Sequence, residues 1–276
     1  MIKVNGRIIE IDKFPNGESN VRIPDHWLSD EPNMETTMTY ELKYESDSDL
    51  FQLYFIKKHF DSLAKVSFTI LKCYYFPYSR MDRVKTFKDV FTLKYVTDFI
   101  NSLGFDSVLI LDAHSDVAPA LLNNVDNTSV IGILLSATQR EGNYNPSSDY
   151  IYFPDSGAEK RYSYLVGVSQ VKTLTAIKHR NFSTGKIESL KVIGDSDLAG
   201  RNVVMVDDLC SFGGTFMLGA KELKARGAGN IFLCVAHCED SIFKGEILTT
   251  PYISKVYTTD SILTKESEKI KIVEIY

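Results

Sequence analysis

Two adjacent carboxylates, Asp207 and Asp208, stand between a run of apolar residues and a short glycine-containing loop. The run Asn202–Val206 predicts a buried strand of a parallel sheet, and the residues after the loop predict a helix. Ligands of open α/β sheets bind at the carboxyl ends of strands, and backbone amides at a helix N-terminus bind anions. The pattern therefore predicts a site for a phosphorylated sugar, with a capped strand-to-helix turn as the structural alternative. The loop consists of Ser211, Phe212, Gly213, Gly214 and Thr215.

Charged and polar residues follow three further predicted strands. They are Arg80 and Asp82 after residues 66–75, His114 after residues 107–111, and Asp155 after residues 150–153. Each one alone is equally compatible with a helix cap. Because the carboxyl ends of parallel strands meet at one edge of a sheet, four such positions in one chain favour a shared site.

The composition is that of a globular protein rather than a general nucleic-acid binder. The chain has 276 residues, of which 44% are hydrophobic and 24% charged, and its net charge is −5. A nucleic-acid surface needs an excess of Lys and Arg, which this chain lacks. No apolar run approaches the ~20 residues of a membrane helix, and residues 1–14 lack the apolar core of a signal peptide, so we expect a cytoplasmic protein without a membrane partner. The four cysteines are expected to be buried thiols.

Short apolar runs alternate with helical stretches along the chain, which predicts an α/β architecture of mainly parallel sheets flanked by helices. The length allows two domains, and we place the boundary near residue 130, giving domains 1–130 and 131–276. In the second half, a strand is predicted at Tyr164–Gln170 and helices at Thr215–Arg226 and Ser241–Thr249. The polar stretch Lys178–Ser189 is predicted to be a mobile loop.

In their order along the chain, the motifs resemble those of the ribose-phosphate pyrophosphokinases, also called PRPP synthetases. The resemblance extends from Phe14 to about Tyr276, and seven motifs in the family's order argue against a chance match. The motifs are Lys13-Phe-Pro-Asn-Gly-Glu18, Pro77-Tyr-Ser-Arg80-Met-Asp82-Arg83, Asp112-Ala-His114, Pro154-Asp155-Ser-Gly157, Ile177-Lys178-His-Arg180, Val206-Asp207-Asp208 up to Thr215, and Ala236-His237.

The resemblance implies a diphosphotransferase. The family transfers the βγ-diphosphate of Mg-ATP to the anomeric 1-hydroxyl of ribose 5-phosphate and releases AMP. This implies two phosphoribosyltransferase-like α/β domains, Mg2+ as cofactor, ATP as co-substrate and assembly into a homo-oligomer. In the family, the FPNGE loop serves the active site of a neighbouring subunit, so adenine sites would be shared between subunits.

The resemblance also assigns a role to the residues that match each motif. Cations, carboxylates and backbone amides suit this chemistry, because displacement at phosphorus builds negative charge on oxygen and requires in-line positioning. The implied roles are adenine or ATP binding for Phe14, Asn16, Glu18, Arg80 and Asp82, catalysis for Lys178, Arg180 and His114, metal binding for His114 and Asp155, and ribose or phosphate binding for Asp207, Asp208 and the loop 211–215.

The phosphate loop departs from the family's usual sequence at two positions. Ser211 replaces an acid, and Phe212 replaces a small hydroxyl residue that helps to hold the 5-phosphate. The departure motivates a second acceptor, ADP-ribose, whose product would be ADP-ribose 1-pyrophosphate, as in the related synthetases of phage NAD-rebuilding pathways. Both acceptors are retained as hypotheses. Two other functions stay open: a non-catalytic partner subunit of a synthetase, and a phosphoribosyltransferase that consumes PRPP.

Overall fold

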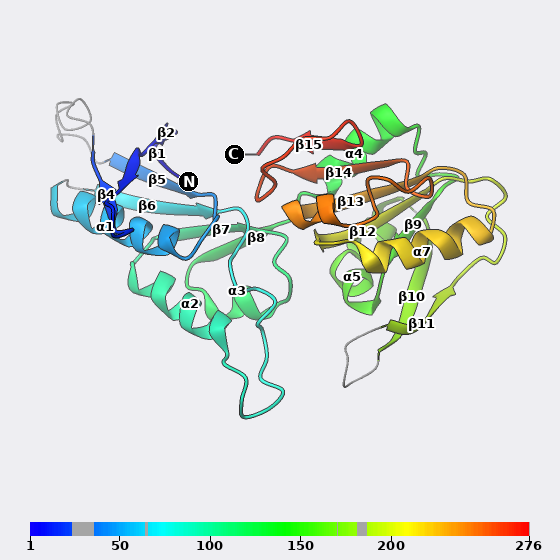
Figure 1. Ribbon diagram of the computed structural model, residues 1–276, viewed down its shortest axis with the longest axis horizontal. Helices are drawn as coiled ribbons and strands as arrows, with labels where there is room; N and C mark the ends of the chain where they lie inside the picture. Colours follow the sequence, from blue (N-terminus) through cyan, green and yellow to red (C-terminus); the bar gives the residue numbers. More distant parts are fainter. Residues whose placement is uncertain (24–35, 64–65, 170, 181–186, 276) are drawn as a thin grey trace. The chain divides into compact units, whose positions relative to one another are not determined.

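The computed structural model of the chain describes residues 1–23, 36–63, 66–169, 171–180 and 187–275 (Figure 1). These residues divide into two compact units, Met1–Thr128 and Ser129–Ile275. The division lies next to the boundary expected near residue 130. Each unit contains a mainly parallel sheet with helices packed on it, so the predicted fold class is confirmed.

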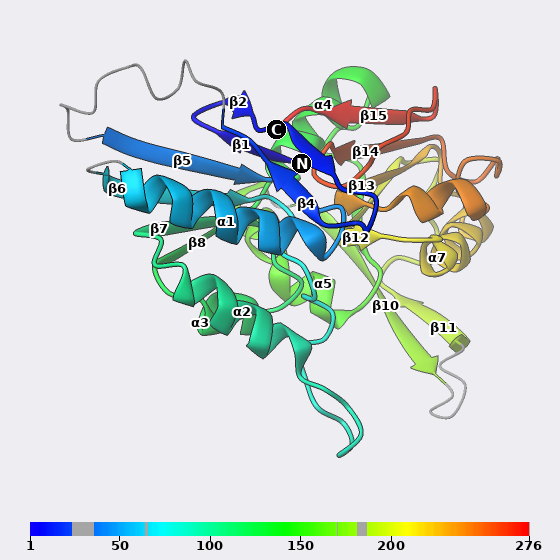
Figure 2. The same ribbon diagram turned by 60° about the vertical axis from the view of Figure 1, so that its left-hand side comes forward.

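The sheet of the first unit has six strands in the order β2-β1-β5-β6-β7-β8. Strands β5 to β8 are parallel, and β1 and β2 join them in antiparallel fashion. A separate antiparallel pair, β3 (Ile11–Lys13) and β4 (Ser19–Val21), lies beside α1 in both views (Figures 1 and 2). The other elements are β1 (Ile2–Val4), β2 (Arg7–Ile8), β5 (Thr36–Leu42), α1 (Ser48–Leu63), β6 (Val66–Cys73), α2 (Thr92–Ser102), β7 (Ser107–Leu111), α3 (Val117–Leu121) and β8 (Val125–Thr128).

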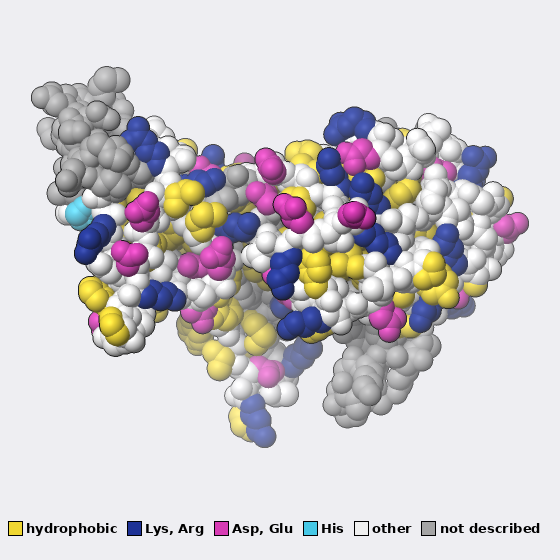
Figure 3. Space-filling model, turned by 45° about the horizontal axis from the view of Figure 1, so that its top comes forward, with side chains coloured by type: hydrophobic (Ala, Val, Ile, Leu, Met, Phe, Trp, Pro, Cys, Tyr) yellow, Lys and Arg dark blue, Asp and Glu magenta, His cyan; other side chains and the backbone are white. Residues whose placement is uncertain are grey.

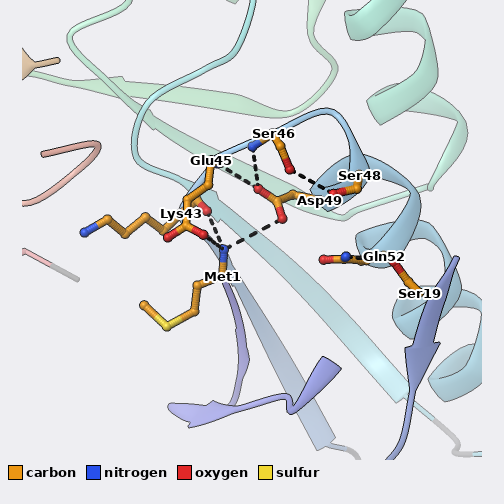
Figure 4. A network of polar contacts seen from close by, with 8 residues as sticks. All are labelled: Met1, Ser19, Lys43, Glu45, Ser46, Ser48, Asp49 and Gln52. Carbon is orange, nitrogen blue, oxygen red and sulfur yellow. Dashed lines mark hydrogen bonds and ion pairs between the residues drawn. The ribbon is translucent and has the colours of Figure 1, made fainter. Parts of the chain in front are cut away.

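A polar network joins β1 to the turn that begins α1 (Figure 4). The Met1 ammonium donates to the carbonyl of Lys43 at 2.8 Å and lies 3.9 Å from the Asp49 carboxylate. The second oxygen of Asp49 accepts the backbone amides of Glu45 and Ser46, at 2.7 and 2.9 Å. A buried carboxylate needs such partners, and here they fix the start of α1 against the sheet.

The sheet of the second unit has seven strands in the order β11-β10-β9-β12-β13-β14-β15, and only β11 pairs antiparallel to its neighbour. The central strands β12 and β13 are almost continuously apolar, as expected for strands covered on both faces. The elements are α4 (Ile131–Gly142), β9 (Tyr150–Phe153), α5 (Ser156–Arg161), α6 (Tyr164–Ser169), β10 (Lys172–Arg180), β11 (Ile187–Ile193), β12 (Val203–Cys210), α7 (Gly214–Ala225), β13 (Ile231–Cys238), the 3-10 helix η2 (Asp240–Lys244), β14 (Lys255–Thr259) and β15 (Ile270–Val273).

Helices α4 and α7 cover opposite faces of this sheet. On α4, Thr138 hydrogen-bonds the thiol of Cys234 at 3.1 Å. On α7, Gly219 packs so closely on Tyr152 that an added Cβ would collide with the tyrosine hydroxyl. Leu233, next to Cys234 in β13, belongs to the core on the α7 side, and successive strand residues point to opposite faces. The carboxyl end of β12 therefore leads into α7 from a sheet that is packed on both sides.

Four of the predicted elements differ from the structure in their type or in their ends. The segment predicted as the strand Tyr164–Gln170 forms the helix α6, and the next strand begins only at Lys172. The predicted loop Lys178–Ser189 is wrong at both ends, where residues pair in the β10–β11 ladder. The helix predicted at Ser241–Thr249 is the shorter η2, which ends at Lys244 because the next residue, Gly245, is extended and packs against the Phe212 carbonyl. The strand predicted to end at Val206 continues to Cys210 alongside β13. The helix predicted at Thr215–Arg226 is confirmed as α7.

The surface carries charges of both signs. On the face seen in Figure 3, Lys and Arg side chains are interspersed with Asp and Glu side chains. All four cysteines are buried thiols, as predicted, and none forms a disulfide. Within the part of the chain that the structure describes, no helix is both long and apolar enough to cross a membrane.

Candidate functional site

The two carboxylates of the second unit lie inside β12, beyond the point where its neighbour β9 ends. The β9–β12 ladder stops at the pair Met205–Tyr152, whereas the β12–β13 ladder continues to Cys210. Asp207 and Asp208 therefore have a strand partner on one side only. Asp208 is 4% exposed. The sheet thus holds both carboxylates rigidly at its carboxyl edge, as expected for a ligand site of an open α/β sheet.

A guanidinium joins the two carboxylates. Nη1 of Arg161, the last residue of α5, hydrogen-bonds Oδ1 of Asp208 and lies 3.5 Å from Oδ1 of Asp207. The Arg161 side chain is 21% exposed, so this ion pair is largely withdrawn from water. Arg161 was not predicted to be a site residue. Only the packing of α5 over the end of β12 brings it to the site.

The electrostatics of the pair are those of a crowded anionic site. Burial raises the pKa of Asp207 well above its ordinary value, and the neighbouring charges of Asp208 and Asp155 raise it further. Like charges placed close together favour binding a cation, a proton or hydroxyl donors. The position is therefore suited to the hydroxyls of a sugar or to a cation.

Asp155 lies at the same edge of the sheet, where it caps the N-terminus of α5. Its Oδ1 accepts the backbone amide of Ala158 at 3.0 Å, which is the helix-cap alternative raised from the sequence. Among the described residues, no group of three or more His, Cys, Asp or Glu side chains is arranged to hold a metal ion. Mg2+ commonly takes only one or two carboxylates together with substrate phosphates and water, so the donors near Asp207 fit it without a cage.

The glycine loop meets α7 in a conformation that requires glycine. Gly213 caps α7 with φ 81°, and an added Cβ would collide with Ile247. On the other side of the loop, Gly245 packs against the carbonyl of Phe212, whose side chain is 57% exposed. The first amides of a helix have no acceptor within the helix and can bind an anion. Gly214 and Thr215 begin α7, so their amides are among those that can bind an anion.

Ser211 is held by a carboxylate from the end of the next strand. Its hydroxyl donates to Oε2 of Glu239 at 2.6 Å, and the hydroxyl of Ser241 donates to the same oxygen at 3.0 Å. The backbone of Glu239 is also fixed, because its amide donates to the carbonyl of Cys210 at 2.9 Å. Glu239 was not predicted to be a site residue. The β12–β13 register, in which Cys210 pairs with Cys238, places Ser211 and Glu239 side by side.

In the first unit, Asp82 and His114 belong to one polar cluster. Arg83 donates to both oxygens of Asp82, at 2.8 and 3.2 Å. Burial alone would raise the pKa of Asp82, but hydrogen bonds from Arg83 and Ser115 and the charges of Arg83 and His114 lower it below its ordinary value. Arg80 is exposed nearby in sequence. The cluster stands where β6 and β7 end, with Asp112 in the left-handed region at φ 39°.

The predicted adenine loop is the tip of the β3–β4 hairpin. The amide of Phe14 donates to the carbonyl of Glu18 at 2.8 Å, and the amide of Glu18 donates to Oδ1 of Asn16 at 3.2 Å. The Phe14 side chain is 50% exposed. Gln52 of α1 donates to Ser19 at 2.9 Å and fixes the hairpin to the unit. The hairpin thus presents an aromatic ring on a defined turn.

The predicted catalytic cations Lys178 and Arg180 lie at the end of β10. Their backbones pair with Leu190 and Ile187 of β11, and the ladder is irregular between residues 179 and 180. Their side chains, and residues 181–186, lie outside the described part of the chain. His237 is 2% exposed and its Nδ1 hydrogen-bonds Ser261 at 2.8 Å, so it lies in the core.

The predicted site residues divide between the two units. The first unit contains those predicted to bind ATP, namely Phe14, Asn16, Glu18, Arg80 and Asp82, and also His114. The second unit contains Asp155, Lys178, Arg180, Asp207, Asp208 and the loop 211–215. Within the second unit, the structure brings Asp155, Asp207 and Asp208 together, and adds Arg161 to them. Glu239 is an addition at the glycine loop, where it binds Ser211.

Comparisons with known proteins point to one family. The chain is 31% identical over 215 residues to a ribose-phosphate pyrophosphokinase of Marinomonas sp. (strain MWYL1), covering 75% of this chain and 66% of that protein. It is 32% identical over 195 residues to the protein of the same name from Vibrio parahaemolyticus, covering 70% of this chain and 60% of that protein. These matches thus span slightly less than two thirds of the length of those relatives.

A solved structure agrees with the sequence matches. The phosphoribosylpyrophosphate synthetase from Mycobacterium smegmatis matches 97% of this chain and 86% of its own, with a TM-score of 0.73 and 17% identity. At that identity the likeness concerns the fold. No protein-family model matches the chain.

Proposed function

The chain belongs to the ribose-phosphate pyrophosphokinase family, and on that premise we propose that it is an ATP-dependent diphosphotransferase. It would transfer the βγ-diphosphate of Mg-ATP to the anomeric 1-hydroxyl of a ribose 5-phosphoryl acceptor and release AMP. We further propose that it acts as a homo-oligomer in the cytoplasm. Small molecules would be its substrates.

One observation carries the proposal: a carboxylate pair near the end of β12 is followed, after the glycine loop, by the N-terminus of α7. Asp207 and Asp208 can accept hydrogen bonds from ribose hydroxyls, and the amides at Gly214 and Thr215 can donate to a phosphate on C5. A ribose 5-phosphoryl group has its hydroxyls and its phosphate at its two ends, which matches this order. The acceptor would thereby be fixed in orientation.

In the reaction, the 1-hydroxyl oxygen attacks the β-phosphorus of ATP, and the bond from that phosphorus to the oxygen bridging to the α-phosphorus breaks. AMP leaves with the bridging oxygen, and the hydroxyl proton passes to solvent. Catalysis of such a transfer is mostly positioning and charge neutralisation. Lys178 and Arg180 would neutralise charge on the transferred diphosphate and exclude water as a competing acceptor.

Asp155 and His114 are the proposed metal-linked residues. Asp155 offers carboxylate oxygens, the donor type that Mg2+ prefers, whereas His114 offers a ring nitrogen, which suits Mg2+ less well. When bound, Mg2+ would supply positive charge to the phosphate oxygens of ATP. Arg161 would hold Asp207 and Asp208 in place.

Two acceptors fit the proposal, ribose 5-phosphate and ADP-ribose. The second is supported by the loop, where Ser211 donates to Glu239 and the exposed Phe212 replaces the family's small hydroxyl residue. A 5-phosphate that carries a further group needs fewer hydrogen-bond donors from the loop. The attached group would find an aromatic surface, the Phe212 ring, to pack against. With ADP-ribose the product would be ADP-ribose 1-pyrophosphate.

The proposal is tested by AMP release from Mg-ATP, measured separately with each acceptor. We expect acceptor-dependent AMP formation that Lys178→Ala lowers by at least roughly a hundredfold, since one cation on the transferred group is lost. Lys172→Ala is the matched control on the same strand, because Lys172 lies 3.9 Å from Asp195 and 5.4 Å from the Tyr150 ring. AMP formation that is absent with both acceptors would favour a non-catalytic partner subunit instead.

A further inference from the structure

Two tyrosine hydroxyls of the first unit, those of Tyr44 and Tyr78, meet at the exposed carboxylate of Asp47. We propose that Asp47 is a positioning residue for ATP: through Tyr78 it fixes the turn that carries Arg80. The inference rests on the proposed function, because it concerns the binding of the ATP that serves there as the diphosphate donor.

Asp47 lies between β5 and α1, and one of its oxygens accepts both hydroxyls. The hydroxyl of Tyr44 donates to Oδ1 at 2.6 Å, and the hydroxyl of Tyr78 donates to the same atom at 2.5 Å. These two hydrogen bonds lower the pKa of Asp47 below its ordinary value, so the carboxylate is charged at neutral pH. Hydrogen bonds to an ionised acceptor are the stronger kind. The carboxylate therefore ties Tyr78 to the turn that precedes α1.

The turn that carries Asp47 is itself held in place. Oδ2 of Asp49 accepts the backbone amides of Glu45 and Ser46, at 2.7 and 2.9 Å (Figure 4). Asp49 is buried, so these hydrogen bonds are shielded from competing water. Asp47 thus presents its carboxylate from a fixed backbone.

Tyr78 needs such support because its backbone is in the left-handed region, at φ 61°. That conformation is unfavourable for a bulky aromatic residue and persists only where the surrounding structure holds it. The parallel pairing of Leu42 with Cys73, the last residues of β5 and β6, brings the segment with Tyr78 beside the turn with Asp47. The side chain of Tyr78 packs on the core of the first unit, while its hydroxyl reaches Asp47. The residue is thus fixed by packing and by a hydrogen bond.

Tyr78 is also the first residue of the turn that carries Arg80. The amide of Met81 donates to the carbonyl of Tyr78 at 2.8 Å, which closes a β-turn with Ser79 and Arg80 as its central residues. The hydroxyl of Ser79 donates to the carbonyl of Phe76 at 2.6 Å and holds the same turn from inside. Because the backbone of the first residue directs the rest of a turn, the conformation of Tyr78 sets the direction in which Arg80 leaves the chain.

The test compares the Kd of Mg-ATP, measured by calorimetry, with the KM values for ATP and for the acceptor, measured by AMP release. Asp47→Ala is expected to raise the Kd and the KM of Mg-ATP by roughly tenfold, the loss of one hydrogen bond to a charged group. The kcat and the KM of the acceptor should change by less than about threefold, because only ATP contacts Arg80. Tyr78→Phe removes the hydroxyl alone and is expected to have the same effect, so it decides the question if Asp47→Ala does not fold.

Two further variants serve as rescue and control. Asp47→Asn keeps an oxygen that can accept both hydroxyls, so the Kd of Mg-ATP should stay within about threefold of that of the unmodified chain. Ser48→Ala alters the same turn without touching the tyrosines, because the Ser48 hydroxyl pairs with that of Ser46 at 2.8 Å (Figure 4). We expect Ser48→Ala to leave the Kd of Mg-ATP unchanged.

A double substitution separates positioning of Arg80 from a general structural role. If Asp47 acts through Arg80, then Asp47→Ala introduced into the Arg80→Ala chain should raise the Kd of Mg-ATP by less than about twofold further. Two independent effects would instead multiply, and the full effect of Asp47→Ala would appear in both backgrounds.

The inference is overturned if Asp47→Ala and Tyr78→Phe leave the Kd of Mg-ATP unchanged, or if the effect persists in full in the Arg80→Ala chain. It is also overturned if the KM of the acceptor rises as much as that of ATP, or if the unmodified chain does not bind Mg-ATP. Failure of the proposed function gives a different result, in which Mg-ATP binds but no AMP appears with either acceptor. The Kd values of the variants then still decide the role of Asp47.

Discussion

Replacement of Arg161 by Met tests whether this guanidinium holds the carboxylate pair together. Met keeps much of the side-chain volume but removes the charge that Asp207 and Asp208 share. Removing one partner of a buried ion pair typically costs 3–5 kcal/mol, because the remaining charge is left without compensation. The Arg161 side chain is 21% exposed and that of Asp208 6%, so water offsets part of this loss. We therefore expect the lower end of this range, a loss of about 3 kcal/mol in the free energy of unfolding at pH 7.5.

The loss should depend on pH in a defined direction. In the folded chain the pKa of Asp207 is already raised, and removal of the neighbouring cation raises it further. The folded state then binds a proton more readily than the unfolded state, so falling pH stabilises the variant relative to the unmodified chain. The loss of unfolding free energy caused by Arg161→Met is therefore expected to be largest near pH 8 and to become smaller toward pH 5.

The assay is urea unfolding of Arg161→Met at several pH values, with thermal unfolding expected to shift by roughly 6–12 °C at pH 7.5. Lys160→Met, an exposed neighbour on α5, is the control and should change stability by less than about 0.5 kcal/mol. Asp208→Asn introduced into the Arg161→Met chain should recover about 1–2 kcal/mol. A deficit below about 1 kcal/mol, or one that is independent of pH and not recovered, would refute the reasoning.

Three further predictions concern the carboxylate pair, the glycine loop and the Phe14 hairpin. Asp207→Asn removes a carboxylate whose pKa burial and its neighbours raise, so it should stabilise the fold by about 1 kcal/mol at pH 8, less at pH 5, while AMP release falls by at least roughly a hundredfold; a loss of stability at pH 8 would contradict the account. Gly213→Ala adds a Cβ at positive φ against Ile247 and should cost about 2–3 kcal/mol in urea unfolding, with a control at Gly214, where an added Cβ meets open space. If adenine is bound by the Phe14 hairpin of a second subunit, then mixing Phe14→Ala with Lys178→Ala should restore AMP release that neither has alone; no recovery after confirmed mixing of subunits would argue against shared sites.

Much of the second unit follows from sequence because its central strands β9, β12 and β13 are largely apolar. The runs in β12 and β13 predict buried parallel strands, and the glycines after Asp208 predict the start of α7. These signals are local: buried strands need apolar residues on both faces, and the turn into α7 needs a glycine at positive φ. Such requirements are visible in one stretch of sequence.

The helices α1 and α4 had weaker signals and were not predicted. In α1 the aromatic residues Phe51, Tyr54 and Phe55 are exposed, so apolar residues occur on more than one side of the helix and obscure its periodicity. The segment at α6 contains Tyr and Val, which favour strands, but its amides bond locally, as when Leu165 donates to Tyr162. Local composition was misleading in both cases.

The residues missed at the site depend on contacts between distant segments. Arg161 reaches Asp208 across 47 positions of sequence, and Ser211 reaches Glu239 across 28. Neither pair has a fixed spacing that a motif could express, because the contacts arise from how α5 and β13 flank β12. The positions of the carboxylates and of the glycine loop could be predicted from the sequence. Their contacts with Arg161 and Glu239 could not.

The central claim is that a diphosphate moves as one unit from ATP to the 1-hydroxyl of a ribose 5-phosphoryl acceptor. The most direct measurement is mass spectrometry of the products formed from Mg-ATP with ribose 5-phosphate and with ADP-ribose, each in a separate reaction. The account predicts that at least one acceptor gains a diphosphate and that AMP appears in equal amount. An acceptor that gains a single phosphate with formation of ADP, or no change in either acceptor, would contradict it.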